Sequence, residues 1–257
     1  MSIHLEIESH VARVTIDRPD RMNAVDAATE ARLQQIWAQI ESDDDIRCVV
    51  LTGAGDRAFC VGADMKGVDS SGLEYWAEPR PGGFGGIALR DTLDVPVIAR
   101  VNGYALGGGF EMVLGCDIVI AREDAEMGLP EPRVGRMLLD GGMVKLPRKI
   151  PYNVAMGMLL TARRVTAAEL ARWGLVNEAV PGDMLDDAVD RWVHDILACA
   201  PLSLKAVKQT VQRTAHLKPA EAQALKLPAV IDALLSEDGE EGVRAFQEKR
   251  PPVWRGR

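Results

Sequence analysis

The sequence predicts an α/β fold in which helices cover sheets of short strands. Along most of its 257 residues, a short apolar run ends at a glycine-containing turn, and a segment with apolar residues at helical spacing follows. From about residue 196 onward, helical spacing alone continues. We therefore expect a core that holds the active site over residues 1–195 and a helical region over residues 196–257.

The first elements follow from alternation and spacing. Residues 3–7 and 11–16 alternate apolar and polar side chains around a polar turn, which predicts a β-hairpin. Residues 26–40 repeat apolar side chains at helical spacing and predict a helix. Residues 48–52 and 97–101 are short apolar runs closed by glycine turns, which predicts two buried strands.

The middle of the chain continues the alternation of strands and helices. Residues 110–116 predict a helix and residues 117–121 a strand. Residues 153–160 and 167–173 each predict a helix. Helices between strands at this frequency are typical of an α/β protein.

Two segments depart from this rhythm. Residues 67–86 are rich in Gly, Pro, Ser and acidic residues, which predicts a long loop or mobile lid. Residues 203–213 and 220–235 predict helices, the second interrupted at Pro228. We expect these helices to pack on a neighbouring subunit.

Composition excludes several classes of function. A net charge of −8 leaves no basic stripe for nucleic acid, although a local basic pocket could still bind a small anion. The four cysteines form no C-x-x-C pair and the four histidines no ligand-spaced cluster, so we expect a reducing cytoplasm and no metal site. No apolar run approaches the ~20 residues of a membrane span. The sequence thus predicts neither a nucleic-acid nor a membrane partner.

A triple glycine followed by a glutamate carries the first chemical signal. Gly107, Gly108 and Gly109 precede Glu111, and a helix that begins near Gly108 would leave free N–H groups able to stabilise an oxyanion. A second glutamate, Glu131, follows Pro130. The plainer interpretation is that the glycines only permit tight packing of a helix on a strand, and both interpretations stay open at this point.

A turn after the strand at 48–52 offers a second oxyanion donor. Within residues 59–66, the Ala63 N–H would be exposed by the turn and Lys66 would supply a cation for a phosphate. Taken alone, the segment is better explained as a plain turn with a solvated lysine. Glu111 and Glu131 could divide proton transfers between water and carbon if their pKa values differ. Most of the 38 acidic residues must nevertheless be surface charges.

At these residues the chain resembles the crotonase superfamily, also called the enoyl-CoA hydratase/isomerase family. The resemblance covers nearly the whole chain, and its motifs are specific. They are the segments 16–19, 23–24, 51–55, 59–66, 96–98, 102–109, 116–117, 130–131, 141–142 and 246–250.

The resemblance implies a spiral of ββα units, with C-terminal helices that build homotrimers or homohexamers. Coenzyme A would carry the substrate, and no resident cofactor or metal is implied. The Ala63 and Gly108 amides would polarise the thioester carbonyl, Glu111 would activate water and Glu131 would deliver a proton to Cα. The predicted coenzyme A contacts are Met22, Ala24, Val61, Asp64, Met65 and Lys66.

Both glutamates together imply a hydro-lyase, with a general enoyl-CoA hydratase or an isomerase as alternatives. Segments 81–86, 172–177 and 248–257 are most similar to family members whose substrate carries a trimethylammonium group. Tyr75, Trp76 and Phe84 could supply aromatic faces for that cation, or could simply pack together. Residues 135–140 depart from the Gly-x-x-Pro common in the family, and Ala63 is the residue of general hydratases. In this stretch Arg136 could address an anionic acyl group or face solvent.

Overall fold

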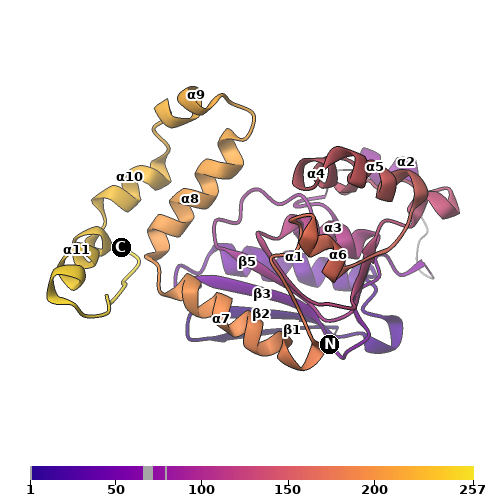
Figure 1. Cartoon of the computed structure of the whole chain (residues 1–257), viewed down its shortest axis with the longest axis horizontal. Coiled ribbons are helices and arrows are strands. Elements are labelled where there is room, and N and C mark those ends of the chain that lie inside the picture. The colour runs from indigo at the N-terminus through magenta and orange to yellow at the C-terminus, as the bar shows by residue number, and fades with distance from the viewer. Residues whose placement is uncertain (1, 66–71, 79) are drawn as a thin grey trace.

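The computed structural model describes residues 2–65, 72–78 and 80–257 as two sheets with helices around them (Figure 1). The strands are β1 Ile3–Glu8, β2 Val11–Ile16, β3 Cys48–Gly53, β4 Ala58–Cys60, β5 Val97–Val101, β6 Tyr104–Leu106, β7 Ile118–Arg122, β8 Glu126–Gly128, β9 Val165–Thr166 and β10 Glu178–Val180. The α-helices are α1 Ala27–Glu41, α2 Gly72–Ala77, α3 Gly108–Gly115, α4 Gly142–Lys149, α5 Tyr152–Thr161, α6 Ala167–Arg172, α7 Leu185–Leu197, α8 Pro201–Thr214, α9 Pro219–Ala224, α10 Pro228–Leu235 and α11 Glu237–Glu248. The short 3₁₀ helices are η1 Pro19–Arg21, η3 Phe84–Gly86, η4 Glu131–Val134 and η5 Gly182–Met184.

From β3 to β8, successive strands alternate between the two sheets. The larger sheet has the order β1-β2-β3-β5-β7-β10, and the smaller one β4-β6-β8-β9. Each pair β3/β4, β5/β6 and β7/β8 therefore gives one strand to each sheet. Strands from successive pairs run parallel, for example β3 with β5 and β4 with β6. This repeated winding confirms the expected α/β spiral. Each turn of the spiral adds one parallel strand to each sheet.

The N-terminal elements form as their local sequence predicts. Ser9 and His10 both adopt positive φ, of 50° and 69°, which closes the β1–β2 hairpin tightly. Helix α1 begins at Ala27 because the Asp26 carboxylate caps it, accepting a hydrogen bond from the Thr29 N–H at 2.9 Å.

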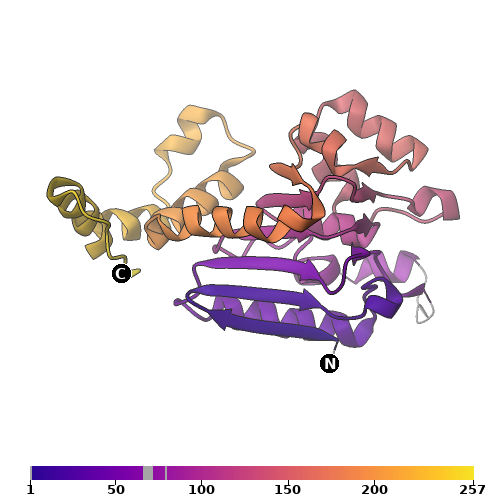
Figure 2. The same ribbon diagram turned by 60° about the horizontal axis from the view of Figure 1, so that its bottom comes forward.

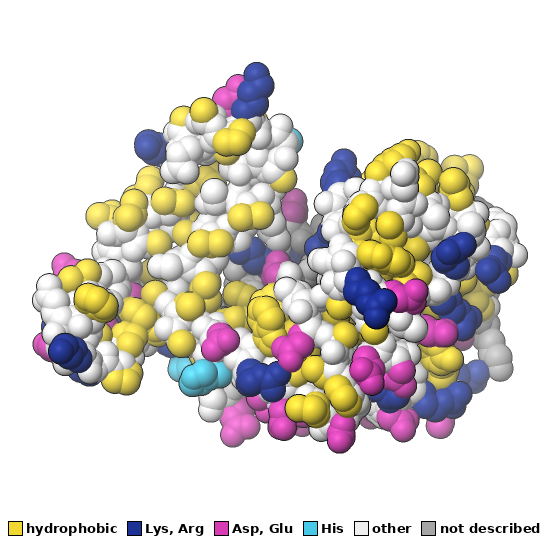
Figure 3. Space-filling model, viewed as in Figure 1, with side chains coloured by type: hydrophobic (Ala, Val, Ile, Leu, Met, Phe, Trp, Pro, Cys, Tyr) yellow, Lys and Arg dark blue, Asp and Glu magenta, His cyan; other side chains and the backbone are white. Residues whose placement is uncertain are grey.

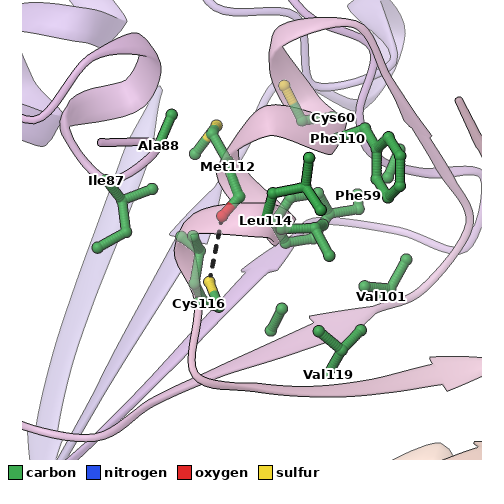
Figure 4. Close-up of a cluster of buried hydrophobic side chains, with 14 of the residues drawn as sticks. Phe59, Cys60, Ile87, Ala88, Val101, Phe110, Met112, Leu114, Cys116 and Val119 are labelled. Carbon is green, nitrogen blue, oxygen red and sulfur yellow. Dashed lines mark hydrogen bonds between the residues drawn. The ribbon is translucent and has the colours of Figure 1, made fainter. Parts of the chain in front are cut away.

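Helix α3 is buried between the sheets and anchors the core. Its residues Phe110 and Leu114 lie close to Phe59 of β4 (Figure 4), and all three side chains are at most 1% exposed. The Cys116 thiol donates to the Met112 carbonyl at 3.4 Å, closing the end of the helix. Because seven of the eight residues of α3 are buried, Glu111 among them, the helix cannot rotate without breaking the core, and its first turn is held rigidly.

The expectation of a long loop or lid over residues 67–86 is wrong for the part that the structure describes. Residues 66–71 and 79 lie outside the described ranges, but α2 and η3 occupy much of the rest. Gly82, Gly83, Gly85 and Gly86 all have positive φ, which lets this segment turn tightly enough to bury Phe84. The many glycines thus build an anchored turn.

The C-terminal helices extend away from the two sheets (Figures 1 and 2). Helix α7 still packs on the larger sheet through Leu185, Val189 and Val193. Helices α8 to α11 follow, and Pro228 starts α10 as its first residue, which explains the predicted interruption. The boundary at residue 195 stays a prediction. Among the described residues, no helix has the length and apolar character that crossing a membrane requires.

Candidate active site

The glycine run brings two backbone segments together at the start of α3. Gly107 has φ 57° and precedes the first helical residue, Gly108. A β-carbon on Gly62 would lie only 3.2 Å from the Gly108 nitrogen. Ala63 therefore follows directly after the point where the turn meets the helix. The two amides that the sequence predicts as an oxyanion pair come from these adjoining segments.

Both amides are available to a ligand. Within the described residues, neither the Ala63 N–H nor the Gly108 N–H donates a hydrogen bond to another group of the chain. Gly108 stands in the first turn of α3, where helix N–H groups have no intrahelical partner and the dipole is positive. An anionic oxygen placed here would receive hydrogen bonds without displacing an internal acceptor.

Each glycine of the run is required by a different neighbour. A β-carbon on Gly107 would lie 2.8 Å from Glu131 Oε1, and one on Gly108 would lie 2.6 Å from the Phe84 ring. A β-carbon on Gly109 would lie 2.0 Å from the Cys60 carbonyl oxygen. The packing interpretation therefore holds for Gly109, while Gly107 and Gly108 also clear space beside a candidate catalytic residue and a free amide.

Glu111 is a buried carboxylate in the first turn of α3. Its side chain accepts hydrogen bonds at Oε1 from the Asp140 N–H at 3.0 Å and the Gly142 N–H at 2.8 Å. The residue is 3% exposed. Burial raises the pKa of the Glu111 carboxyl to about 8, and the nearby Asp140 and Glu131 carboxylates add to the rise.

Glu131 begins η4 and extends toward Gly107. Its Oε2 is buried and has no hydrogen-bond partner within the described part of the chain. Burial raises the pKa of the Glu131 carboxyl to about 7, with a further contribution from Asp140. An unpaired buried oxygen is costly, so its retention marks a group that is available to a reactant.

The predicted coenzyme A contacts lie on adjoining segments. A bridge between Val25 and Ala63 sets residues 22–25 beside residues 61–64. Within them, Met22 and Val61 are half-buried, Ala24 is buried and Met65 is exposed. Arg18 holds the segments together through its ion pairs with Asp64 at 3.0 Å and Asp26 at 2.8 Å. Asp64 therefore has an internal partner, and Lys66 lies outside the described residues.

The three aromatic residues proposed for a cation are in different environments. Tyr75 carries the Arg80 guanidinium 4.3 Å above its ring and donates its hydroxyl to Asp140. Trp76 is 65% exposed, and Phe84 is buried against Gly108. A guanidinium thus already occupies one face of Tyr75. Arg136 is exposed, in keeping with the solvated alternative.

Sequence reasoning missed Asp140 and Glu30 as members of this site, and it considered Tyr75 only as an aromatic face for a cation. Asp140 is 8% exposed and Glu30 7%, and burial raises the pKa of both carboxyls. Asp140 stands directly before Gly141-Gly142, and an acidic residue before a glycine pair is the one local signal that could have pointed to it. Glu30 and Tyr75 carry no such signal.

Comparison with known proteins gives one consistent result. A model of the family described as enoyl-CoA hydratase/isomerase matches residues 6–257. A carnitinyl-CoA dehydratase of Proteus mirabilis is 37% identical, covering 100% of this chain and 99% of the relative. A probable enoyl-CoA hydratase/isomerase of Mycobacterium abscessus has a TM-score of 0.89 at 36% identity, covering 100% of this chain and 99% of that one. An enoyl-CoA hydratase of Bacillus anthracis has a TM-score of 0.92 at 31% identity, with 100% of both chains covered.

Glu111→Gln should stabilise the protein at alkaline pH. Because the folded state raises the Glu111 pKa from 4.5 to about 8, the contribution of this residue to stability is full below pH 4.5 and is lost as pH rises through about 8. Glutamine does not ionise and escapes that loss. We compare the unfolding free energy of the variant with that of the parent at each pH. We expect this difference to be about 3 kcal/mol more favourable to the variant at pH 8 than at pH 5. Urea denaturation at both pH values measures it, with the exposed Glu240→Gln as control. A gain independent of pH would contradict this account.

Proposed function

Because the chain belongs to the enoyl-CoA hydratase/isomerase family, we propose that it catalyses the reversible addition of water to an enoyl-CoA thioester. The observation that carries the proposal is that the buried carboxylate of Glu111 and the half-buried Glu131, whose Oε2 is buried, both lie near the start of α3, where the Gly108 amide is free. Hydration needs one group to take a proton from water and another to give a proton to carbon. An acid/base pair with pKa values of about 8 and 7 can do both near neutral pH.

The thioester carbonyl binds at the Ala63 and Gly108 amides in this proposal. When water adds to Cβ, the electrons of the double bond move onto the carbonyl oxygen and form an enolate. In this proposal the two free N–H groups donate to that oxygen and stabilise the developing charge. Loss of one such donor typically lowers turnover by about 10²–10³.

The two glutamates exchange one proton each. In hydration, ionised Glu111 takes a proton from the attacking water and protonated Glu131 gives its proton to Cα. In dehydration, Glu131 takes the Cα proton and Glu111 protonates the departing hydroxyl. Burial raises the pKa of both carboxyls, so each can take up or release a proton near neutral pH, as both directions of the reaction require.

For the acyl group, we propose carnitinyl-CoA and its unsaturated product, crotonobetainyl-CoA. Relatives 36–37% identical over the whole chain that bear the name carnitinyl-CoA dehydratase support this choice. The alternative is a short- or medium-chain enoyl-CoA, as in the structural relatives named enoyl-CoA hydratase. An isomerase is a further alternative because the family includes this activity in its description. The steps use only residues of this chain, and we propose no resident cofactor.

Coenzyme A would lie along the joined segments 22–25 and 61–65. Met22, Ala24, Val61 and Met65 offer apolar surface there, while the carboxylate of Asp64 is engaged by Arg18. The assignment of Lys66 to a coenzyme A phosphate remains part of the proposal.

We also propose that the C-terminal helices assemble the chain into a homotrimer or a homohexamer. Apolar side chains cover much of the visible face of α8 to α10 (Figure 3). The exposed apolar residues of this region include Val207, Val211, Ile231, Leu234, Leu235, Val243 and Phe246. Apolar surface of this extent on a projecting region is typical of a subunit interface.

The central test is turnover of a substrate panel. Crotonyl-CoA, longer enoyl-CoAs and crotonobetainyl-CoA are compared by loss of the enoyl-thioester absorbance and by incorporation of ¹⁸O from labelled water. We expect hydration, fastest with crotonobetainyl-CoA, and about 10²–10⁴-fold lower kcat in Glu111→Gln and Glu131→Gln. An alkene shift without ¹⁸O, retained by Glu111→Gln, would instead establish an isomerase.

The pH dependence of kcat/KM should be bell-shaped. Below about pH 7 the pair gains a second proton and lacks a base, and above about pH 8 it loses its last proton and lacks an acid. Initial rates between pH 5.5 and 9.5 measure both limbs. A rate that rises without falling up to pH 9.5 would rule out a carboxylic acid as proton donor.

Leu234→Asp should dissociate the assembly, since this side chain is 78% exposed within one chain and an interface would bury it. Sedimentation velocity should show the parent as a trimer or hexamer and the variant as smaller species. Glu240→Lys, also near the surface of these helices, is the matched control. A monomeric parent at micromolar concentration would contradict the assembly.

A further inference from the structure

Asp140 is a buried residue with a carboxylate that is neither one of the two predicted catalytic glutamates nor part of the predicted oxyanion pair. Its Oδ1 accepts a hydrogen bond from the Phe84 N–H at 2.9 Å, and its Oδ2 accepts one from the Tyr75 hydroxyl at 2.7 Å. Both partners precede the glycine run in the chain, on α2 and at the start of η3. The carboxylate therefore fastens these two elements to the segment before α4.

The peptide of the same residue holds Glu111. The Asp140 N–H donates to Glu111 Oε1, beside the N–H of Gly142. A displacement of the Asp140 backbone would thus move one of the two donors that orient Glu111. Asp140 therefore contacts α2 and η3 through its side chain and Glu111, in the first turn of α3, through its backbone N–H.

The Phe84 contact extends this connection to the oxyanion side. The Phe84 ring lies where a side chain of Gly108 would be. The next residue of η3 is held as well: the Glu30 carboxylate accepts from the Gly85 N–H at 2.9 Å, and the Trp37 indole donates to the Gly85 carbonyl at 2.7 Å. Because both Phe84 and Gly85 are held by hydrogen bonds, the Phe84 ring is fixed beside Gly108.

We propose that Asp140 is a positioning residue that orients Glu111 for proton transfer and couples this orientation to the seating of Tyr75 and Phe84. The proposal rests on the proposed hydration activity for its catalytic consequence. It deepens that activity by naming a residue that acts through Glu111 and touches no substrate.

The charges around Asp140 give the coupling a measurable signature. The titratable and charged groups that face it are Glu30 of α1, Tyr75 of α2, Arg80, Glu111 of α3 and Glu131 of η4. Arg80 is exposed, so it compensates the buried charge only in part. The negative charge of Asp140 consequently raises the pKa of the carboxyls of Glu111 and Glu131.

Asp140→Asn tests this signature because it removes the charge and keeps the backbone N–H. In a ¹³C-carboxyl NMR titration without substrate, we expect Glu111 and Glu131 to titrate about one pH unit lower than in the parent. The pH optimum of turnover should move by a similar amount, with KM changed less than threefold. Asp187→Asn, an exposed residue on α7, is the control and should change neither. Unshifted titrations with a uniform loss of rate at every pH would overturn the proposal.

Tyr75→Phe provides a second test that does not require Asp140→Asn to fold. It keeps the Asp140 charge and removes one hydrogen bond. We expect amide exchange of α2 to accelerate at least tenfold and kcat to fall several-fold, while Leu73→Met, at an exposed position on the same helix, changes neither. Faster exchange in α2 with unchanged kcat and an unchanged Glu111 resonance would overturn the coupling. A parent without hydration activity would refute the proposed function, whereas the substrate-free titration would still decide whether Asp140 acts on Glu111.

Discussion

The close approach of the turn at residues 61–63 to the first turn of α3 is the constraint on which the site depends. Backbone meets backbone there, since a β-carbon on Gly62 or Gly109 would come within 3.2 Å or 2.0 Å of main-chain atoms. The 2.0 Å distance at position 109 is possible only for glycine, and Gly62 has a φ of 91°, a conformation that favours glycine. The packing and oxyanion interpretations of the glycine run are therefore two consequences of one geometry: the helix is packed so tightly that its free amides lie at the edge of the sheet.

The parts of the fold that were predictable are those with local patterns. The β1–β2 hairpin, α1, β3 and β5 follow from alternation, helical spacing or continuous apolar runs within each segment. The smaller sheet was missed because β4, β6, β8 and β9 have two or three residues each, too few for any periodicity. Their pairing is decided by neighbouring strands. Tertiary contacts likewise order residues 80–86, which look like a loop from composition alone.

The same distinction applies to the site. Glu111 and the Gly108 amide could be proposed from sequence because their signal lies within five residues, and Glu131 because it follows Pro130 and pairs with Glu111, a pairing that the resemblance then reinforced. Asp140 could not be assigned a role in advance, since its partners Glu111 and Tyr75 are 29 and 65 positions away. No local pattern records that a carboxylate will be buried beside two others. Only the folded chain shows that these groups share one environment.

The chain contains two kinds of carboxylate shielded from solvent, one paired with arginine side chains and one without such a partner, and their pKa values shift in opposite directions. Glu241 of α11 is held by Arg250, by Arg244 and by the Val253 N–H, and these donors hold its pKa well below the usual range. Such a group stays ionised and fastens the C-terminal tail. Within the described part of the chain, Glu111 and Glu131 have no comparable cation and Glu131 Oε2 has no hydrogen-bond partner, so burial raises their pKa values. The fold could have satisfied these carboxylates as it does Glu241. Leaving them under-compensated costs stability and yields groups that can exchange a proton near neutral pH.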